Sequence, residues 1–370
     1  MLNVRRRQRG AVPLPRTLAA LSLTALVLAG LGVGPGSSPT ASATVSTTTS
    51  PKIATVKAAP VKTARVTTAP SGAARMRAAR RLVDRVEFGA YVDGMTHAPQ
   101  RLAAFESLVR APTDIASYYW GFGDIFPGAI ERSFARNGTR KVLLSWDMGP
   151  TRFSEWTNGQ HDDYLDDLVA ASLAYPWTVY VRPWPEMNGD WQEFQPTADG
   201  ARPYGGTYAE FRAAWRYLVT YFRARGVTNL RWVFNPTVDV YVGTTPVGLI
   251  WPGAAYVDVL GIDGFNWGRD SKWGRWKSFE QTFAPMYRRL TALHPTAPVW
   301  ICEVGSKEPS RSDGAPRDLR QSKARWTKDA LTTRSFPRLR VVVWFHARKE
   351  RDWRVNSSPG ALRVLRRALR

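Results

Sequence analysis

The C-terminal three quarters of this chain repeat one pattern eight times. A short apolar run, rich in β-branched or aromatic residues, is in most cases followed by a longer stretch with helical spacing. Alternating strands and helices predict a parallel sheet. Eight units in a single domain favour closure into a (β/α)8 barrel, the TIM barrel, over an open sheet. The strands are expected at residues 88–92, 116–121, 141–146, 178–184, 230–235, 257–262, 298–303 and 340–345.

The stretches with helical spacing lie between most of these runs, at residues 100–109, 162–174, 208–225, 279–294, 319–332 and 360–369. Two connections depart from the pattern. Residues 236–256 have little helical periodicity, so the fifth helix is expected to be short or replaced by a loop. Residues 189–206 form a long, Gly- and Pro-rich segment after the fourth strand, and long loops at that end of a barrel usually shape the substrate groove.

The N-terminal part has the composition of a leader and a spacer. Residues 1–43 combine a basic start, an apolar core at 18–33 and an A-x-A sequence at 41–43, which predicts a signal peptide and a secreted or cell-surface protein. The apolar core is short for a bilayer span, so no stable span is expected after cleavage, although a retained anchor is the alternative. Residues 44–86 lack aromatic residues and predict a disordered spacer. All 16 Trp follow, so residues 87–370 are assigned to the barrel.

The net charge of +22 is divided between these parts. Residues 1–87 hold 14 Lys or Arg and 2 Asp or Glu, a net of +12, and the remainder holds +10. A basic domain can bind nucleic acid, but no motif supports that partner and export argues against it. An anionic cell-wall or membrane surface is the better use of the charge, and simple solubility is the alternative.

The sequence offers no metal or cofactor motif. His97, His161, His294 and His346 lack the spacing of a metal site, and the chain has neither a phosphate-binding glycine loop nor a dinucleotide fingerprint. Cys302 is the single cysteine, so no internal disulfide forms, and a buried inert thiol is expected. Because it precedes Glu303 on a strand, its side chain is expected on the opposite face. We expect no metal, no cofactor and a monomer.

Two glutamates follow apolar runs on strands that are far apart in sequence. Glu186 comes directly after the fourth predicted strand, and Glu303 ends the seventh. Catalytic groups of such barrels collect at the C-terminal ends of the strands. Two carboxyl groups facing each other there are the minimal machinery for hydrolysing a glycosidic bond, one donating a proton and the other attacking the anomeric carbon. A separation of about 5–5.5 Å would give net retention of configuration.

Further residues at strand ends are candidates for substrate binding. Arg182 lies four residues before Glu186 on the same predicted strand, where it could orient a carboxylate, lower its pKa, or form a structural ion pair. Asn188 could hydrogen-bond sugar hydroxyls or close the loop. Indole rings at a barrel mouth stack on pyranose rings, so three tryptophans are read as sugar platforms rather than core residues: Trp191, Trp267 and Trp344. Weaker candidates at strand ends are Trp120, Asp147, Asn235 and His346.

Four segments, at 182–191, 251–267, 301–306 and 343–354, resemble glycoside hydrolase family 26, which groups β-mannanases with some mixed-linkage β-glucanases. The likeness covers nearly the whole barrel part, in order. It implies a (β/α)8 barrel and a retaining mechanism that needs no cofactor, with Glu186 as acid/base and Glu303 as nucleophile. The implied substrate is a β-1,4-linked polysaccharide, most directly a β-mannan, and the alternative within the family is a mixed-linkage β-1,3-1,4-glucan.

Two positions depart from the family pattern. The family usually has His before the acid/base, where this chain has Pro185, and often has Tyr where this chain has Phe265. That tyrosine hydroxyl hydrogen-bonds the nucleophile in the family. Asp263 and Asn266, which flank Phe265, are candidates to take over its polar role. The departures leave three readings open: a divergent subfamily with substitute donors, a slow enzyme, or a barrel that binds glycan without cutting it.

Overall fold

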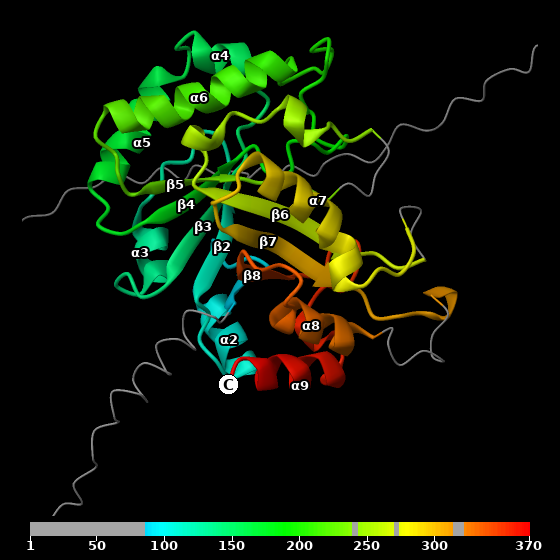
Figure 1. Ribbon diagram of the computed structural model, residues 1–370. Helices are drawn as coiled ribbons and strands as arrows, with labels where there is room; N and C mark the ends of the chain where they lie inside the picture. Colours follow the sequence, from blue (N-terminus) through cyan, green and yellow to red (C-terminus); the bar gives the residue numbers. More distant parts are fainter. Residues whose placement is uncertain (1–85, 239–242, 270–273, 314–321) are drawn as a thin grey trace, which may run out of the picture. The chain divides into compact units, whose positions relative to one another are not determined.

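The computed structural model describes residues 86–238, 243–269, 274–313 and 322–370. The predicted signal peptide at 1–43, and the spacer at 44–86 apart from its last residue, lie outside the described residues. Eight parallel strands close into a barrel in which β8 pairs with β1, which confirms the predicted (β/α)8 fold (Figure 1). The strands are β1 (Glu87–Val92), β2 (Ile115–Trp120), β3 (Lys141–Trp146), β4 (Val179–Pro183), β5 (Leu230–Phe234), β6 (Val259–Asn266), β7 (Val299–Ser306) and β8 (Leu339–His346).

Helices pack around the outside of the barrel. They are α2 (Gln100–Val109), α3 (Ala129–Ala135), α4 (Phe153–Thr157), α5 (Asp162–Leu173), α6 (Tyr208–Ala224), α7 (Phe279–Leu293), α8 (Lys323–Thr332) and α9 (Pro359–Ala368). Six of them confirm the helical stretches expected from the sequence. Helices α3 and α4 were not expected, because one or two turns are too short to establish a periodic apolar face. None of the helices in the described ranges is long and apolar enough to cross a membrane.

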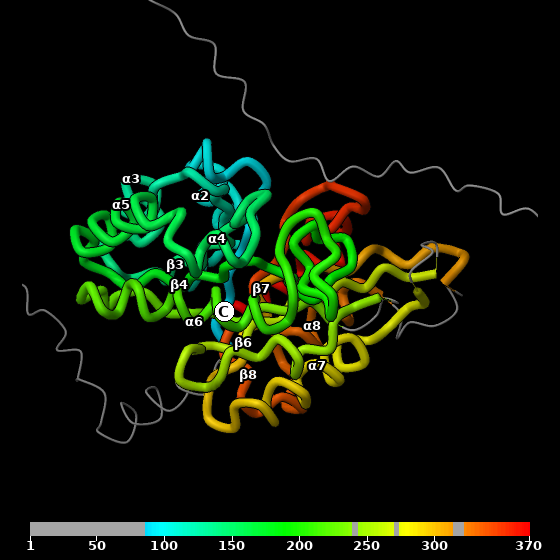
Figure 2. The backbone as a smooth tube through the Cα atoms, turned by 90° about the horizontal axis from the view of Figure 1, so that it is seen from above, coloured from blue at the N-terminus to red at the C-terminus, as the bar shows by residue number. Residues whose placement is uncertain are grey.

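The two irregular connections are as the sequence indicates. In the described part of the β5–β6 connection the helical structure consists of two 3-10 turns, η1 (Val247–Leu249) and η2 (Ala254–Tyr256). The β4–α6 connection is a long loop, which Figure 2 shows in green as an excursion from the barrel. Helix α6 begins cleanly after it because Thr207 and Glu210 form a reciprocal capping box.

Two apolar clusters hold the barrel together. The larger one lies between the strands and the helices and contains fully buried indoles such as Trp146, Trp215 and Trp326. Burying one large apolar side chain contributes about 1.5–3 kcal/mol, so this layer dominates the stability. The smaller one fills the barrel interior with Ile115, Leu143, Val233, Val259, Trp300, Cys302, Val341 and Val343. The interior is therefore a packed core on which a site can be built at the mouth.

Strand β7 contains an irregularity that changes which residues face inward. Ile262 of β6 pairs with Ile301, but Asp263 pairs with Glu303, so Cys302 is one extra residue on β7. The β7–β8 register shifts at the same place. The expectation that Cys302 and Glu303 lie on opposite faces is therefore wrong. Cys302 belongs to the interior cluster, and the bulge lets Glu303 also point into the barrel, where it contacts Arg182.

Candidate active site

Glu303 is held by donors from two other strands. Its Oε1 accepts a hydrogen bond of 2.5 Å from the hydroxyl of Tyr119, on β2, and another of 2.5 Å from Nη2 of Arg182, on β4. Only 9% of the residue's surface is exposed. Two donors on one oxygen fix the orientation of the carboxyl group. Glu303 is thus preoriented at the mouth.

Arg182 connects four strands in one buried network. Its Nε donates to Oγ of Ser145 on β3 at 2.6 Å, and its Nη1 donates to Oδ2 of Asp263 on β6 at 2.7 Å. Burial alone would lower the pKa of Arg182, but the charges of Asp263 and Glu303 outweigh burial and hold this pKa well above its usual value. The guanidinium therefore stays charged and fixes Glu303 against Asp263.

Asp263 has a less favourable environment than Glu303. It is fully buried, and burial raises its pKa well above the usual value, with Arg182 opposing the shift and Glu303 adding to it. Its second oxygen, Oδ1, has no hydrogen-bond partner within the described residues. Asp263 therefore contributes to the site by holding Arg182. It does not donate a hydrogen bond to Glu303 in place of the tyrosine hydroxyl that Phe265 lacks.

Glu186 reaches the same mouth from a loop. Strand β4 ends at Pro183, so Glu186 lies three residues beyond it, and the expectation that Arg182 and Glu186 share a strand is wrong. The backbone N–H of Glu186 donates to the carbonyl of Asn235, at the end of β5, at 2.9 Å. The Nε1–H of Trp191 donates to Oε2 of Glu186 at 3.0 Å. These contacts fix both the backbone and the carboxyl group of Glu186.

The surroundings of Glu186 favour its protonated form. Burial, followed by the negative charge of Glu303, raises its pKa to about 7, against the smaller opposing effects of Trp191 and Arg182. Below that pH its carboxyl group keeps a proton. A carboxyl group that keeps its proton, beside a second carboxyl group that is held by two donors, is the arrangement of a general acid next to a nucleophile.

The loop that carries Glu186 has an unusual backbone. Trp184 and Glu186 have φ angles of 47° and 55°, in the left-handed region that side chains other than glycine rarely adopt. Each such residue costs about 1–3 kcal/mol and persists where the surroundings enforce it. Trp184 is fully buried against Phe153 and Phe211. Its packing thus fixes the turn that aims Glu186 at the mouth.

Asn188 and Trp191 hold this loop in different ways. The Asn188 side chain is fully buried and exchanges two hydrogen bonds with the backbone of Thr237, at 2.8 and 3.0 Å. Of the two roles considered for Asn188, the structure shows the one that closes the loop. Trp191 is 41% exposed, and its ring covers Gly189 so closely that a Cβ there would lie 2.6 Å from the indole. Gly189 thus permits the indole to lie beside Glu186.

Aromatic rings cluster at the end of β6. Phe265 and Trp267 are half-buried. Their rings pack against Trp353, with ring centroids 4.9 Å apart in both cases. The ring of Phe345 contacts Phe265 at 5.7 Å and Tyr91 at 4.9 Å. The structure therefore places Phe265 and Trp267 together at the end of β6.

Trp344 lies elsewhere than the sequence indicated. It is fully buried on the outer face of β8, with its ring against Trp326 of α8 and its Nε1–H on the carbonyl of Trp353. A ring in that position cannot stack on a sugar, so the expectation of a platform is wrong. Alternation along β8 puts the next residue, Phe345, at the mouth instead. A position at the end of a strand does not by itself fix which side chain points inward, so the aromatic ring at the mouth comes one residue later than expected.

Three of the weaker candidates also occupy peripheral positions. Trp120 donates from its indole to Glu131 of α3 at 2.8 Å. Asp147 is exposed and accepts from the backbone of Gly149. His346 is buried, accepts from the backbone N–H of Val355, and has its pKa lowered to about 4 by burial and then by Arg354 and Lys323.

The fourth weaker candidate lies close to Glu186. Asn235 is fully buried at the end of β5, and both polar atoms of its side chain lack partners within the described residues. It contributes to the site through its backbone carbonyl.

Two residues of the site, Tyr119 and Ser145, were not expected from the sequence. Both lie at strand ends that the sequence located correctly. On β2 every residue from Ser117 to Trp120 carries a polar side-chain atom, so alternation of polarity did not indicate which of them faces the mouth. Among the described residues, no group of three or more His, Cys, Asp or Glu side chains is arranged to hold a metal ion.

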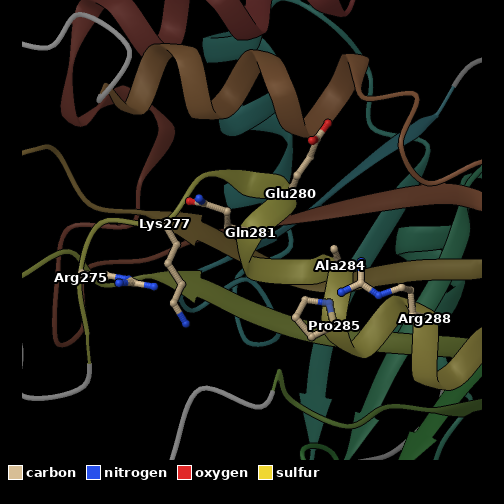
Figure 3. Close-up of a pocket in the computed structure, with 7 residues that line it drawn as sticks. All are labelled: Arg275, Lys277, Glu280, Gln281, Ala284, Pro285 and Arg288. Carbon is tan, nitrogen blue, oxygen red and sulfur yellow. The ribbon is translucent and has the colours of Figure 1, made fainter.

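A hollow of about 450 Å³ lies apart from this site, beside the start of α7 (Figure 3). It is lined by Arg275, Lys277, Glu280, Gln281, Ala284, Pro285 and Arg288. None of the candidate site residues lines it. Its open, mostly helical lining makes it a surface feature of α7 rather than the groove over the two glutamates.

A (β/α)8 barrel that brings two carboxyl groups to one mouth, from the loop after its fourth strand and from its seventh strand, has the architecture of the barrel glycoside hydrolases. Residues 164–300 match the model of Glycosyl hydrolase family 26. Endoglucanase H of Acetivibrio thermocellus is 33% identical over 289 residues, which cover 77% of this chain and 30% of that protein. The chain belongs to glycoside hydrolase family 26.

Other comparisons agree with this assignment. The mannan endo-1,4-beta-mannosidase A and B of Caldalkalibacillus mannanilyticus is 40% identical over 148 residues, covering 40% of this chain and 24% of that protein. The chain thus spans less than a third of the length of either relative. The catalytic domain of a Bacillus sp. JAMB-750 GH26 endo-beta-1,4-mannanase superposes with a TM-score of 0.53 at 17% identity, over 78% of this chain and 86% of that one. At this identity the superposition shows the shared fold.

Proposed function

We propose that this protein is a retaining endo-β-glycosidase that hydrolyses a β-1,4-linked polysaccharide, most directly a β-mannan. The observation that carries the proposal is that two carboxyl groups at one mouth have different surroundings. Glu186 keeps a proton because burial and the charge of Glu303 raise its pKa to about 7. Glu303 is held in a fixed orientation by hydrogen bonds from Arg182 and Tyr119 to its Oε1.

The proposed reaction proceeds in two halves. In the first, Glu303 attacks the anomeric carbon while Glu186 gives its proton to the departing sugar oxygen, so a covalent glycosyl-enzyme forms. In the second, Glu186 takes a proton from a water molecule that attacks the same carbon, and the bond to Glu303 breaks. Trp191 would contact a sugar bound beside Glu186, since its indole donates to Glu186 and the residue is 41% exposed.

A mixed-linkage β-1,3-1,4-glucan is the second candidate substrate. The relative that matches over the greater length is named an endoglucanase, whereas the shorter match at higher identity is named a mannosidase. A GH26 domain from a Prevotella bryantii endo-beta-mannanase/endo-beta-glucanase superposes with a TM-score of 0.52 at 15% identity, over 81% of this chain and 95% of that one. The two substrates differ in hydroxyl orientation and linkage, so the loops around the mouth would decide between them.

The test is a screen of residues 44–370 against mannan, glucomannan, mixed-linkage glucan, curdlan and xylan, with released reducing ends as the readout. Glu186→Ala and Glu303→Ala are the inactive controls. Proton NMR of the first product formed should show the β-anomer before mutarotation. Release of the α-anomer first would overturn the retaining mechanism, and tight glycan binding without any product would favour a non-catalytic binding barrel.

We propose in addition that the protein is exported and associates with an anionic cell-wall surface. Residues 1–43 support export by their composition. The charge of the barrel part is concentrated: residues 322–370 hold 14 Lys or Arg against 3 Asp or Glu, whereas residues 88–321 hold 24 against 25. Retention on isolated cell walls that is lost at high salt would support this association, and retention independent of salt would contradict it.

A further inference from the structure

Tyr119 contacts the nucleophile but has no part in the two steps described above. Strand β2 is not a neighbour of β7 in the barrel, so the side chain of Tyr119 reaches across the mouth to Glu303. Its hydroxyl and Nη2 of Arg182 both donate to the same oxygen, Oε1, each at 2.5 Å. Within the described residues neither donor reaches Oε2. The carboxylate is therefore fixed by one oxygen and presents the other.

The ring of Tyr119 is itself held in place. It packs edge-on against Tyr91, with centroids 4.9 Å apart, and the Arg182 guanidinium lies 5.7 Å from its centroid. Burial and the neighbouring charge of Glu303 raise the pKa of the Tyr119 hydroxyl well above its usual value. The hydroxyl thus stays protonated and can only donate toward the carboxylate.

Position 265 supplies no hydroxyl for a hydrogen bond to Glu303, because it is a phenylalanine. Phe265 lies between Trp353 and Phe345, with ring centroids 4.9 and 5.7 Å away. The tyrosine that this family often places there is absent from the sequence. The phenol that contacts Glu303 comes from β2 rather than β6, so this chain supplies the hydrogen bond from another strand.

We propose that Tyr119 is a positioning residue that holds Oε1 of Glu303 and stabilises the carboxylate when it leaves the sugar. The inference rests on the proposed function. In the first half, Oε2 bonds to the anomeric carbon and the negative charge of Glu303 is lost. In the second, water attacks, Glu186 takes its proton, and the electron pair of the carbon–Oε2 bond returns to Glu303. The Tyr119 hydrogen bond is strongest when that charge is present.

This role affects the two halves differently. Losing the donor removes stabilisation from the carboxylate as a leaving group, which slows breakdown of the glycosyl-enzyme. Formation of the glycosyl-enzyme is slowed less, because the unassisted carboxylate is also the more reactive nucleophile. The glycosyl-enzyme should therefore accumulate, and kcat and KM should fall together.

The test compares Tyr119→Phe with Tyr217→Phe. Each variant removes one phenolic hydroxyl that donates to a carboxylate. The hydroxyl of Tyr217 donates to Asp162 at 2.6 Å in the outer helical layer, away from the site. With an aryl β-glycoside that carries a good leaving group, Tyr119→Phe should lower kcat about 10- to 100-fold. It should also lower KM, give a burst of released phenol and show the glycosyl adduct on Glu303 by mass spectrometry. Tyr217→Phe should change none of these.

The outcomes separate this inference from the proposed function. If the wild-type protein cleaves no glycan or aryl glycoside, the proposed function fails first. If the wild type is active and Glu303→Ala is not, unchanged kinetics in Tyr119→Phe would overturn the role of Tyr119. A lower kcat with unchanged or raised KM and no adduct would also overturn it. Melting temperatures of the two Phe variants, measured in parallel, separate lost stability from lost chemistry.

Discussion

The two glutamates at the mouth are held in place by different kinds of structure. Glu303 lies within a strand and is held by charged and neutral donors from β2 and β4, with Asp263 of β6 behind Arg182. Glu186 lies on a loop with a left-handed backbone, and its carboxyl group accepts a hydrogen bond from the half-exposed Trp191 of the same loop. One fold thus gives two identical side chains different tasks: donors from two strands fix Glu303, whereas burial and the charge of Glu303 raise the pKa of Glu186 to about 7.

The largest expected effect tests whether the two carboxyl groups have different tasks. Glu303→Ala should lower kcat by about 10⁴-fold or more for every substrate, because no covalent intermediate can form. Glu186→Ala should be comparably slow on polysaccharide but much less impaired in the first half-reaction of an aryl glycoside whose leaving group needs no proton. Steady-state and burst kinetics on both substrates measure this, and equal losses on the aryl glycoside would remove the distinction.

The next effect concerns the donors around Glu303. Arg182→Ala leaves Asp263 and Glu303 without their shared cation, so it should lower the free energy of unfolding by about 3–5 kcal/mol. Arg140→Ala is the matched control, because Arg140 is also buried, bonds Glu106 at 2.5 Å and precedes β3 at the other end of the barrel. Both variants should unfold earlier in urea, whereas the activity of the folded protein should fall in Arg182→Ala alone.

A smaller effect tests the environment of Glu186. The pKa of Glu186 is raised in the folded state from 4.5 to about 7, so ionisation favours the unfolded chain between those pH values. The resulting destabilisation is absent below about pH 4.5 and complete above about pH 7. Glu186→Gln should thus stabilise the protein by about 1–3 kcal/mol at pH 8 and hardly at all at pH 4. Chemical denaturation at both pH values checks the sign.

The smallest effect is in the pH dependence of activity. Since Glu186 must carry its proton to act as an acid, kcat/KM on polysaccharide should decline tenfold per pH unit above about pH 7. An aryl glycoside with a good leaving group should show a weaker decline. An alkaline limb that begins below pH 5 would mean that burial does not hold the proton of Glu186.

Much of the fold was open to prediction from sequence. The eight strands follow from β-branched and aromatic runs, and the long helices follow from apolar periodicity over three or more turns. Glu186 and Glu303 were found because they follow such runs. What could not be predicted was the inward or outward direction of individual side chains, as Trp344 and Cys302 show. Direction depends on register between strands, which is a property of pairs that no single segment carries.

The donors of Glu303 show the same limit at the site. Arg182 was identified by its position in a recognisable segment, whereas Tyr119 lies 184 residues from its partner in sequence. The sequence shows that Phe265 lacks a hydroxyl, but it does not show from where another phenol arrives. That compensation depends on which strand ends face each other across a closed barrel.

The extra residue in β7 places a thiol in the barrel interior beside the nucleophile. Deleting Cys302 would leave Glu303 opposite Asp263, because Ile262 pairs with Ile301 and Asp263 pairs with Glu303. The carboxyl group would keep its inward direction, but the interior cluster would lose one fully buried side chain, which leaves a cavity under the mouth. The bulge therefore contributes to the floor of the site more than to the direction of its nucleophile.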